Sequence, residues 1–362
     1  MDLSELERSL RKALWFNKAT LACLCQMILS LINYRTVDLS QLAAGLHGHA
    51  LLASKQRRLK RLLRRWPEQI DWLGPWLLGW FYDEHEKISL TMDRTNWKIG
   101  QVNVNFLVVG VVYRRIAIPL LFVLLEKQGN SNTSERIALT ERVLKHISKE
   151  RIVNILADRE FVGEGWFAWL NKNDIPFKIR VKHNYLSTNS RGLEVVVDAL
   201  FYGLKPGERL SLQGKRLLLG QWVYLSGSRL PCGELMIVAS PVDDGCAITM
   251  YCERWEIETF FQNLKSRGFN LEDTHIIKTE RLTALFQILM LATCWCIKSG
   301  EWIIEQGRLI ALKNHGRPSK SLFRHGLDAI REAVSARFGR DQQVELLRLW
   351  QFKSSPACPF AF

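Results

Sequence analysis

The segment Tyr251–Lys265 reads YCERWEIETFFQNLK and combines a phenol, a guanidinium, a carboxylate and an amine. It has no Pro or Gly and carries apolar residues at helical spacing, which predicts a helix. At about 100° per residue, Tyr251, Arg254, Glu258 and Lys265 would share an arc of about 60°. A carboxylate flanked by cations suits a metal ligand set among groups that hold phosphates. The alternative is a solvated charged face, the usual environment of charged helix residues.

Two more carboxylates follow predicted strands. Residues 88–92 alternate between apolar and polar types, and Asp93 closes this strand. Residues 152–157 are nearly all apolar, as in a parallel central strand, and Asp158 follows them. Each Asp could instead be a turn or capping residue. With Glu258, the two could converge on one edge of a sheet.

Three such carboxylates would favour Mg²⁺, with Mn²⁺ as a substitute, because both are hard cations that prefer oxygen ligands. Two ions about 4 Å apart can activate the attacking oxygen and stabilise the leaving oxygen of a phosphodiester. Water would attack first, and the freed 3′-hydroxyl could then attack a second phosphodiester at the same site. No covalent enzyme nucleophile is required.

The charge of the chain indicates a polyanionic partner. Lys and Arg number 50 against 36 Asp and Glu, giving a net charge of +14 and a pI of about 9.5. Nucleic acid is the favoured partner, and a membrane surface is the competing one. The predicted helix 50–65 concentrates this charge, with Leu52, Leu59, Leu62 and Leu63 at core spacing. Its predicted phosphate contacts are Lys55, Arg57, Arg58, Arg61, Arg64 and Arg65. The alternative is a solvated basic face.

Other classes of site lack their signatures. The eight cysteines form no CxxC pair and no zinc spacing, which predicts reduced thiols. No GxxxxGK[ST] motif occurs, so we expect no nucleotide cofactor. The N-terminal MDLSELERSL is too charged for a signal peptide, and the apolar run 284–297 is short for a membrane span. We therefore expect no membrane association and a buried core helix at 284–297.

The remaining pattern predicts the elements that position these residues. Residues 1–82 are predicted to be helical, ending in a Trp-rich helix from Pro67 to near Tyr82. Residues 88–182 predict the order β-β-β-α-β-α-β, which is the order of the ribonuclease H-like fold. In that fold the first acid lies on the first strand and the second at the end of the fourth, where Asp93 and Asp158 fall.

The predicted fold class is therefore α/β, a ribonuclease H-like catalytic core with a β-rich insertion between two helical regions. Five predicted domains follow: 1–85, a helical DNA-binding region; 86–182, the first part of the core; 183–244, the β-rich insertion; 245–300, core helices with Glu258; and 301–362, a helical tail for DNA binding or dimerisation.

Three sequence blocks carry a resemblance to a known family. Tyr251, Arg254, Glu258 and Lys265 meet the pattern Y-x2-R-x3-E-x6-K at every spacing. DRTNW begins at Asp93, and ADREFVG surrounds Asp158. Across roughly residues 40–335 the chain resembles the DDE transposases of bacterial insertion-sequence family four, in the subgroup with the Tyr-Arg-Glu-Lys signature.

The resemblance implies roles for these residues. Asp93, Asp158 and Glu258 would bind Mg²⁺ as the catalytic triad, and Tyr251, Arg254 and Lys265 would hold the DNA of the transposon end. Family members carry a β-strand insertion between the second acid and the Glu, and here that gap is 258 − 158 = 100 residues. Many also cut through a DNA hairpin, aided by a Trp of the insertion that supports a flipped base. Trp222 is the best placed candidate, although a core position would explain it equally well.

The resemblance thus implies a cut-and-paste transposase that cleaves element ends by hydrolysis and joins them to target DNA. Its partners would be double-stranded DNA, as terminal inverted repeats and target, and a second copy of the chain in a synaptic homodimer. We expect a bacterial, cytoplasmic and nucleoid-associated protein. Two alternatives stay open: a structure-specific nuclease on the same fold, and an inactive DNA-binding relative.

Overall fold

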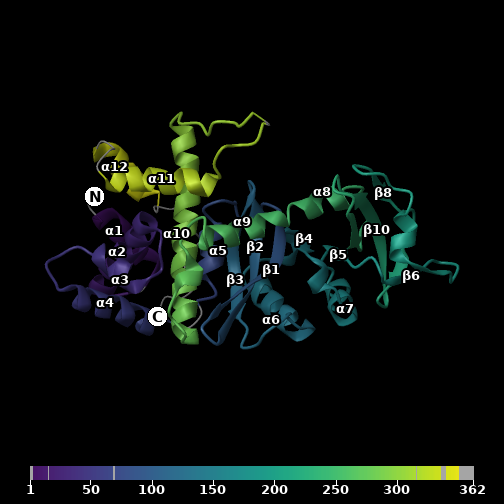
Figure 1. Ribbon diagram of the computed structural model, residues 1–362, viewed down its shortest axis with the longest axis horizontal. Coiled ribbons are helices and arrows are strands. Elements are labelled where there is room, and N and C mark those ends of the chain that lie inside the picture. The colour runs from purple at the N-terminus through teal and green to yellow at the C-terminus, as the bar shows by residue number, and fades with distance from the viewer. Residues whose placement is uncertain (1–2, 15, 68–69, 315, 336–339, 350–362) are drawn as a thin grey trace. The chain divides into compact units, whose positions relative to one another are not determined.

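The computed structural model describes residues 3–14, 16–67, 70–314, 316–335 and 340–349. The chain forms two compact units. The sheet unit comprises Tyr82–Asn96 and Val104–Phe260. The helical unit comprises Met1–Phe81, Trp97–Asn103 and Phe261–Phe362. Figure 1 labels the elements of both.

An eleven-stranded, mostly antiparallel sheet is the framework of the sheet unit. The strands are β1 (Ile88–Ile99), β2 (Val102–Tyr113), β3 (Ile116–Leu124), β4 (Ile152–Ala157), β5 (Phe177–Val181), β6 (Leu186–Thr188), β7 (Glu194–Val196), β8 (Arg209–Ser211), β9 (Arg216–Leu218), β10 (Gln221–Arg229) and β11 (Leu235–Ser240). Their order is β3-β2-β1-β4-β5-β11-β10-β9-β6-β7, with β8 paired to β10.

The strand β4 lies between two parallel neighbours, as its apolar sequence predicts. It pairs in parallel with β1 on one side and with β5 on the other. Five of its six residues are buried, and only Val153 is exposed. A strand covered on both faces needs apolar residues at successive positions rather than alternating ones. The predicted order of elements over 88–182 is also confirmed.

The strand β1 is longer than the sequence pattern predicts. The prediction that Asp93 closes the strand is wrong, because β1 continues to Ile99. Thr95 and Trp97 are buried while Asn96 and Lys98 are exposed, the alternation of a strand with one covered face. Gly100, with φ of 58°, then turns the chain into β2. Asp93 therefore lies within a strand, one residue beyond Met92, which is the last β1 residue that pairs with β4.

Four helices accompany the sheet: α6 (Thr133–Leu144), α7 (Glu164–Lys172), α8 (Ala247–Cys252) and the first part of α9 (Trp255–Leu264). Short 3₁₀ turns are η1 (Lys149–Arg151), η2 (Arg159–Phe161) and η3 (Val197–Phe201). A capping box starts α6, since Asn132 and Glu135 each accept the other's backbone N–H. Helix α6 ends at Leu144, before the turn η1.

The insertion continues the main sheet instead of forming a separate one. Strand β11 pairs antiparallel with β5, and β10 pairs antiparallel with β11. The β-rich character predicted for residues 183–244 is confirmed by the strands β6 to β11. Hydrogen bonds therefore run without interruption from the strand that precedes Asp158 into the insertion.

The helical unit contains α1 (Ser4–Ala13), α2 (Lys18–Tyr34), α3 (Leu39–Ala44), α4 (Leu52–Arg65), α5 (Leu73–Leu78), α10 (Thr279–Glu305), α11 (Leu322–Val334) and α12 (Arg340–Arg348), with the turn η4 (Leu271–Asp273). The predicted core helix at 284–297 is confirmed as part of α10, which packs against α2, α4, α5 and α11. Within the described residues, α10 alone is long and apolar enough to cross a membrane, and 89% of its most apolar window is buried.

Two predicted helical segments of this unit differ from the structure. The helix expected from Pro67 to Tyr82 is confined to α5, because Gly74, Pro75 and Gly79 favour a single short turn of helix. In the tail predicted to be helical, 301–362, the described helices beyond the end of α10 are α11 and α12, and residues 336–339 between them lie outside the described residues. The final segment 353–362 lies outside them as well.

Candidate active site

The two aspartates of the site follow directly from the pairing of β1 with β4. These strands are parallel, and Met92 is the partner of Ala157. Asp93 directly follows Met92, and Asp158 directly follows Ala157. The register therefore brings the two aspartates to adjacent positions at one place in the sheet. Asp93 is mostly buried, with a side chain that is 15% exposed.

Backbone N–H groups fix one oxygen of each aspartate. The N–H of Arg94 donates to Asp93 Oδ1 at 2.7 Å, and the N–H of Glu160 donates to Asp158 Oδ1 at 2.8 Å. The second bond starts the turn η2, for which Asp158 is the capping residue. Each carboxylate is thus oriented through Oδ1, with its second oxygen directed elsewhere.

The third acid lies on a helix that differs from the prediction. The segment Tyr251–Lys265 is not one helix, because α8 ends at Cys252 and α9 begins at Trp255. Tight i→i+3 hydrogen bonds join them, including the N–H of Arg254 to the carbonyl of Tyr251 at 3.0 Å. The single arc calculated for the four signature residues is therefore wrong. Arg254 and Glu258 nevertheless meet across one turn at 2.6 Å.

The guanidinium of Arg254 joins two of the predicted metal ligands. Its Nη1 donates to Asp93 Oδ2 at 3.2 Å, and its Nη2 donates to Glu258 Oε1 at 2.6 Å. The arginine side chain is only 6% exposed. Its Cζ lies 5.9 Å from the ring centre of the buried Tyr251 and 5.3 Å from that of Trp255. One buried cation, within cation–π distance of two aromatic rings, is thus shared by the carboxylates of Asp93 and Glu258.

Because the site is buried, the ionised form of Asp93 needs a positive charge beside it. It raises the pKa of the Asp93 carboxyl to about 7, against the opposing effects of the Arg254 charge and the Arg94 backbone N–H. The neighbouring charge of Asp158 adds to the rise. Burial also raises the pKa of the Tyr251 phenol, which keeps that group neutral. An ionised Asp93 is therefore stable only with a cation beside it.

The donor chemistry fits a divalent metal, although the side-chain arrangement does not yet form its coordination shell. Carboxylate oxygens are the ligands that hard divalent cations prefer. Among the residues that the structure describes, no three His, Cys, Asp or Glu side chains are grouped closely enough to hold an ion. Arg254 already supplies positive charge to Asp93 and Glu258. A metal ion at these oxygens would therefore have to replace the guanidinium.

A carboxylate outside the signature anchors α9. Glu256 accepts hydrogen bonds from the backbone N–H of Tyr113 at 2.7 Å and of Arg115 at 3.0 Å. These residues form the β2–β3 turn, in which Arg114 and Arg115 have φ values of 45° and 72°. Sequence reasoning missed this role. Glu256 fixes the start of α9 against the sheet, two residues before Glu258.

The last signature residue, Lys265, follows α9 and belongs to the helical unit. There its ammonium pairs with Glu272 at 2.7 Å and lies 5.9 Å from the ring centre of Trp97. An ion pair on a partly exposed surface contributes only about 0–1 kcal/mol, so the pair with Glu272 opposes an exchange of that carboxylate for a phosphate only weakly.

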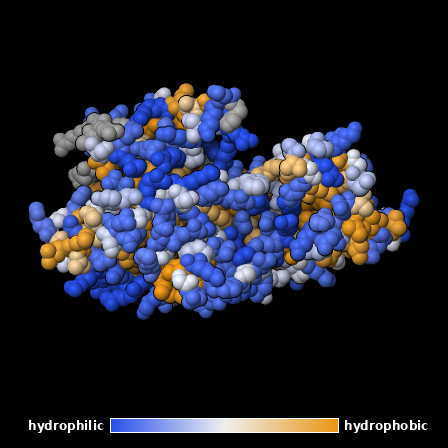
Figure 2. Space-filling view, viewed as in Figure 1, coloured by the Kyte–Doolittle hydropathy of each residue, from blue (hydrophilic) through white to orange (hydrophobic). Residues whose placement is uncertain are grey.

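Helix α4 presents its predicted basic face to solvent (Figure 2). Arg57, Arg61, Arg64 and Arg65 are exposed, and Lys55 and Arg58 are partly exposed. Within the described part of the chain, none of the six forms an ion pair with a carboxylate. Leu59, Leu62 and Leu63 are buried as predicted. The prediction for Leu52 is wrong, since it is 53% exposed at the first turn of the helix.

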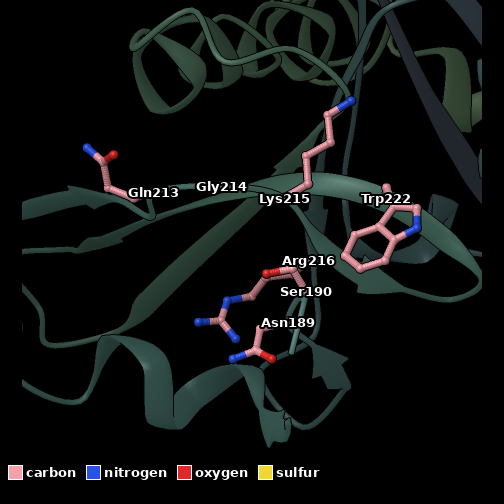
Figure 3. Close-up of a pocket in the computed structure, with 7 residues that line it drawn as sticks. All are labelled: Asn189, Ser190, Gln213, Gly214, Lys215, Arg216 and Trp222. Atoms are coloured by element: carbon pink, nitrogen blue, oxygen red, sulfur yellow. The ribbon is translucent and has the colours of Figure 1, made fainter. Parts of the chain in front are cut away.

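Trp222 lies at a cavity in the insertion, not in the core. Its side chain is 46% exposed, which excludes the alternative interpretation as a core residue. It lines a cavity of about 530 Å³ together with Asn189, Ser190, Gln213, Gly214, Lys215 and Arg216 (Figure 3). Nε and Nη1 of Arg216 are buried without a hydrogen-bond partner. Figure 3 shows the Arg216 and Asn189 side chains near each other, whereas the Lys215 ammonium points away from Trp222 and lies 5.4 Å from the ring centre of Tyr224.

Comparisons with known proteins identify the class. The chain is a transposase, an enzyme of DNA cleavage and strand transfer. It belongs to the family described as "Transposase DDE domain", whose model matches residues 91–295. Enzymes of this family use divalent metal ions. The matched range includes Asp93, Asp158 and Glu258.

A solved structure of another transposase is also similar. The cryo-EM structure of the piggyBac transposase synaptic complex with hairpin DNA matches with a TM-score of 0.45 and 10% sequence identity. The match covers 95% of this chain and 78% of that chain. A search of curated proteins found no match.

Proposed function

We propose that this protein is a cut-and-paste transposase of a bacterial insertion sequence, in family four and its Tyr-Arg-Glu-Lys subgroup. The observation that carries the proposal is the parallel pairing of β1 with β4, which ends with Met92 opposite Ala157 and so places Asp93 beside Asp158, with Glu258 joined to Asp93 through Arg254. The order of elements around the two aspartates supports a ribonuclease H-like core. The five domains predicted from the sequence remain part of this proposal.

Asp93, Asp158 and Glu258 are proposed to hold the divalent ions, with Mg²⁺ as the cofactor and Mn²⁺ as its substitute. The bound ions would activate the attacking oxygen and stabilise the leaving one. The backbone N–H groups of Arg94 and Glu160 fix Oδ1 of each aspartate, and Oδ2 of each would then be the oxygen offered to an ion. Burial of Asp93 strengthens its attraction to a cation, because the local dielectric constant is low.

Arg254 is proposed to act on DNA once it leaves the carboxylates. Its planar guanidinium suits a phosphate, which can accept two hydrogen bonds from it. The rings of Tyr251 and Trp255 hold its side chain close to the site in either position. In this proposal Tyr251 and Lys265 also contact the transposon end. The substrate phosphate would thus be bound beside the acids that cleave it.

The remaining DNA contacts are proposed at two surfaces. The exposed cations of α4 would hold the terminal inverted repeats, since each neutralised phosphate adds salt-dependent affinity. In the insertion, Trp222 would stack on a base flipped out of a hairpin end. The protein would act as a homodimer that joins two ends before it engages target DNA. We place it in the bacterial cytoplasm at the nucleoid, without membrane or nucleotide cofactor.

The test is excision from a supercoiled plasmid that carries both element ends, in Mg²⁺. Wild type is compared with Glu258→Gln and with Glu253→Gln, a matched change at a neighbouring partly buried carboxylate. We expect wild type and Glu253→Gln to excise the element, and Glu258→Gln to bind the ends without cutting. Equal cutting by Glu258→Gln would refute the triad.

The same assay separates the two alternatives. A pre-cleaved element end is added as a second substrate, together with target DNA. If the protein cuts the plasmid but never joins this end to the target, it is a structure-specific nuclease. Binding of the ends by all three proteins with no cleavage would identify an inactive DNA-binding relative. Concerted joining of two ends by the wild type supports the transposase.

A further inference from the structure

The residues that orient the two aspartates are themselves joined. Arg94 and Glu160, whose N–H groups hold Asp93 and Asp158, form a two-bond ion pair. Nε of Arg94 donates to Glu160 Oε1 at 2.5 Å, and Nη2 donates to Glu160 Oε2 at 2.7 Å. Their side chains are 10% and 19% exposed. The pair therefore connects β1 to the turn η2 through side chains as well as through the sheet.

All five N–H donors of the Arg94 guanidinium are used. Besides the two bonds to Glu160, Nη1 donates to Asn105 Oδ1 at 3.0 Å and to the carbonyl of Gly129 at 2.7 Å. Nη2 donates to Asn130 Oδ1 at 2.9 Å. A guanidinium has five donors in a fixed plane, so no other side chain can replace this set. Arg94 is accordingly fixed in position by three segments of the chain.

The loop that completes this set is shaped for it. Gly129 has φ of 80°, a left-handed conformation that favours glycine. Its carbonyl accepts from both Arg94 and the side-chain amide of Asn105, the latter at 3.0 Å. The Asn105 amide also donates to the carbonyl of Lys127 at 3.2 Å. The loop is thus folded around the guanidinium.

Glu160 is held on its other side by a second arginine. Nη2 of Arg136 donates to the Glu160 carbonyl at 2.9 Å, and its Nε donates to Ser131 Oγ at 2.9 Å. Arg136 is buried, and its Cζ lies 5.0 Å from the ring centre of Phe161. Glu160 is therefore fixed by its carboxylate, its carbonyl and its N–H, and the N–H is the group that orients Asp158.

We propose that Arg94 and Glu160 are positioning residues for metal binding, which form a clamp that sets the two aspartates in register. The inference rests on the proposed function of the aspartates. The clamp touches neither substrate nor reacting atoms. It fixes the two N–H groups that hold Oδ1 of Asp93 and Asp158. The distance and direction between the two Oδ2 atoms are thereby kept constant. Partners of metal ligands of this kind typically change metal affinity 10–100-fold when they are removed.

The test measures Mn²⁺ binding to the full chain without DNA, by electron paramagnetic resonance of free Mn²⁺. We expect Arg94→Gln and Glu160→Gln each to weaken binding by about 10-fold or more. The double variant should be no worse than either single one, because both remove the same clamp. Arg94→Lys keeps the charge but has three donors, and we expect it to restore little of the affinity. Binding to an end DNA should be unchanged in all of them.

Matched controls separate the clamp from general destabilisation. Arg180→Gln and Glu234→Gln break another Arg–Glu pair of the sheet unit, and both should bind Mn²⁺ like wild type. Where Arg94→Gln fails to fold, Glu160→Gln carries the same test. Folded clamp variants with Mn²⁺ affinity within twofold of wild type would overturn the inference, as would full rescue by Arg94→Lys.

Asp158→Asn distinguishes failure of the clamp from failure of the proposed function. We expect it to abolish Mn²⁺ binding at the site. If Asp158→Asn abolishes binding and the clamp variants do not weaken it, the clamp alone is refuted. If Asp158→Asn binds Mn²⁺ like wild type, the aspartates are not the ligands, and both proposals fall.

Discussion

Replacement of Arg254 by Gln should destabilise the protein in a way that a divalent metal repairs. The change leaves Asp93 and Glu258 without their shared cation. Loss of one partner from a buried ion pair costs about 3–5 kcal/mol. The lower end applies here, because Glu258 is 33% exposed and because Asp93, whose pKa is about 7 even with Arg254 beside it, takes up a proton more readily once that charge is removed. We expect a loss of about 3 kcal/mol in the free energy of unfolding at pH 7.5.

A metal ion would supply the missing charge in the variant. At 100 times its dissociation constant, a ligand that binds only the folded state adds about 2.7 kcal/mol, so Mg²⁺ should restore most of the loss. Wild type should gain less from the same Mg²⁺ concentration, because there the ion must first displace the guanidinium from Asp93 and Glu258. The variant should therefore bind Mg²⁺ more tightly than wild type while binding end DNA more weakly.

The assay is urea unfolding followed by tryptophan fluorescence, with and without Mg²⁺, for wild type, Arg254→Gln and Arg180→Gln. Arg180→Gln removes a cation of the same kind from the sheet unit and should gain no extra stability from Mg²⁺. If Mg²⁺ stabilises wild type as much as it stabilises Arg254→Gln, the guanidinium and the metal do not compete. The proposed exchange of Arg254 between carboxylates and phosphate would then be wrong.

Three further predictions follow from other parts of the chain. Burial raises the pKa of Glu256 to about 7, so its contribution to the stability of the fold is present at low pH and is lost as pH rises through 7. The melting temperature of wild type should therefore fall between pH 5 and 8. Glu256→Gln should make this fall smaller. Arg61→Ala with Arg64→Ala should lower the slope of log affinity for DNA against log salt by about 2, with unchanged stability, and an unchanged slope would exclude α4 from phosphate contact. Trp222→Ala should weaken binding of a DNA end with an unpaired base by about 1–3 kcal/mol, measured by fluorescence anisotropy, whereas Trp222→Phe should retain most of it. An equal loss for fully paired DNA would contradict base stacking.

The sequence predicted the elements that carry strong local patterns. The apolar run of β4 indicated a parallel central strand, and that placement brings Asp158 beside β1. The alternation at Thr95 and Trp97 could have shown that β1 continues past Asp93. Leu52 kept helical spacing yet lies at the first turn of α4, where the helix face is exposed. Periodicity gives the direction of a side chain but not what covers it.

The parts that escaped prediction depend on contacts between distant segments. Nothing in YCERWEIETFFQNLK marks a break, which the structure places between Cys252 and Trp255. There Glu256 binds the β2–β3 turn and Arg254 reaches Asp93, and both contacts exist only after the sheet has formed. The pairing of Arg94 with Glu160 likewise requires β1 and β4 to be neighbours. The sequence does contain an indication of this pair, because Arg94 directly follows Asp93 and Glu160 lies two residues after Asp158.

The route of the chain through the insertion makes this segment a replaceable module. The chain leaves the core at the end of β5 and returns on β11, which pairs with β5 at a spacing of about 4.8 Å. The two attachment points are therefore adjacent, and the gap that the segment between them must bridge stays constant whatever the length of that segment. A segment of different length could therefore be grafted between β5 and β11, with these two strands as fixed junctions.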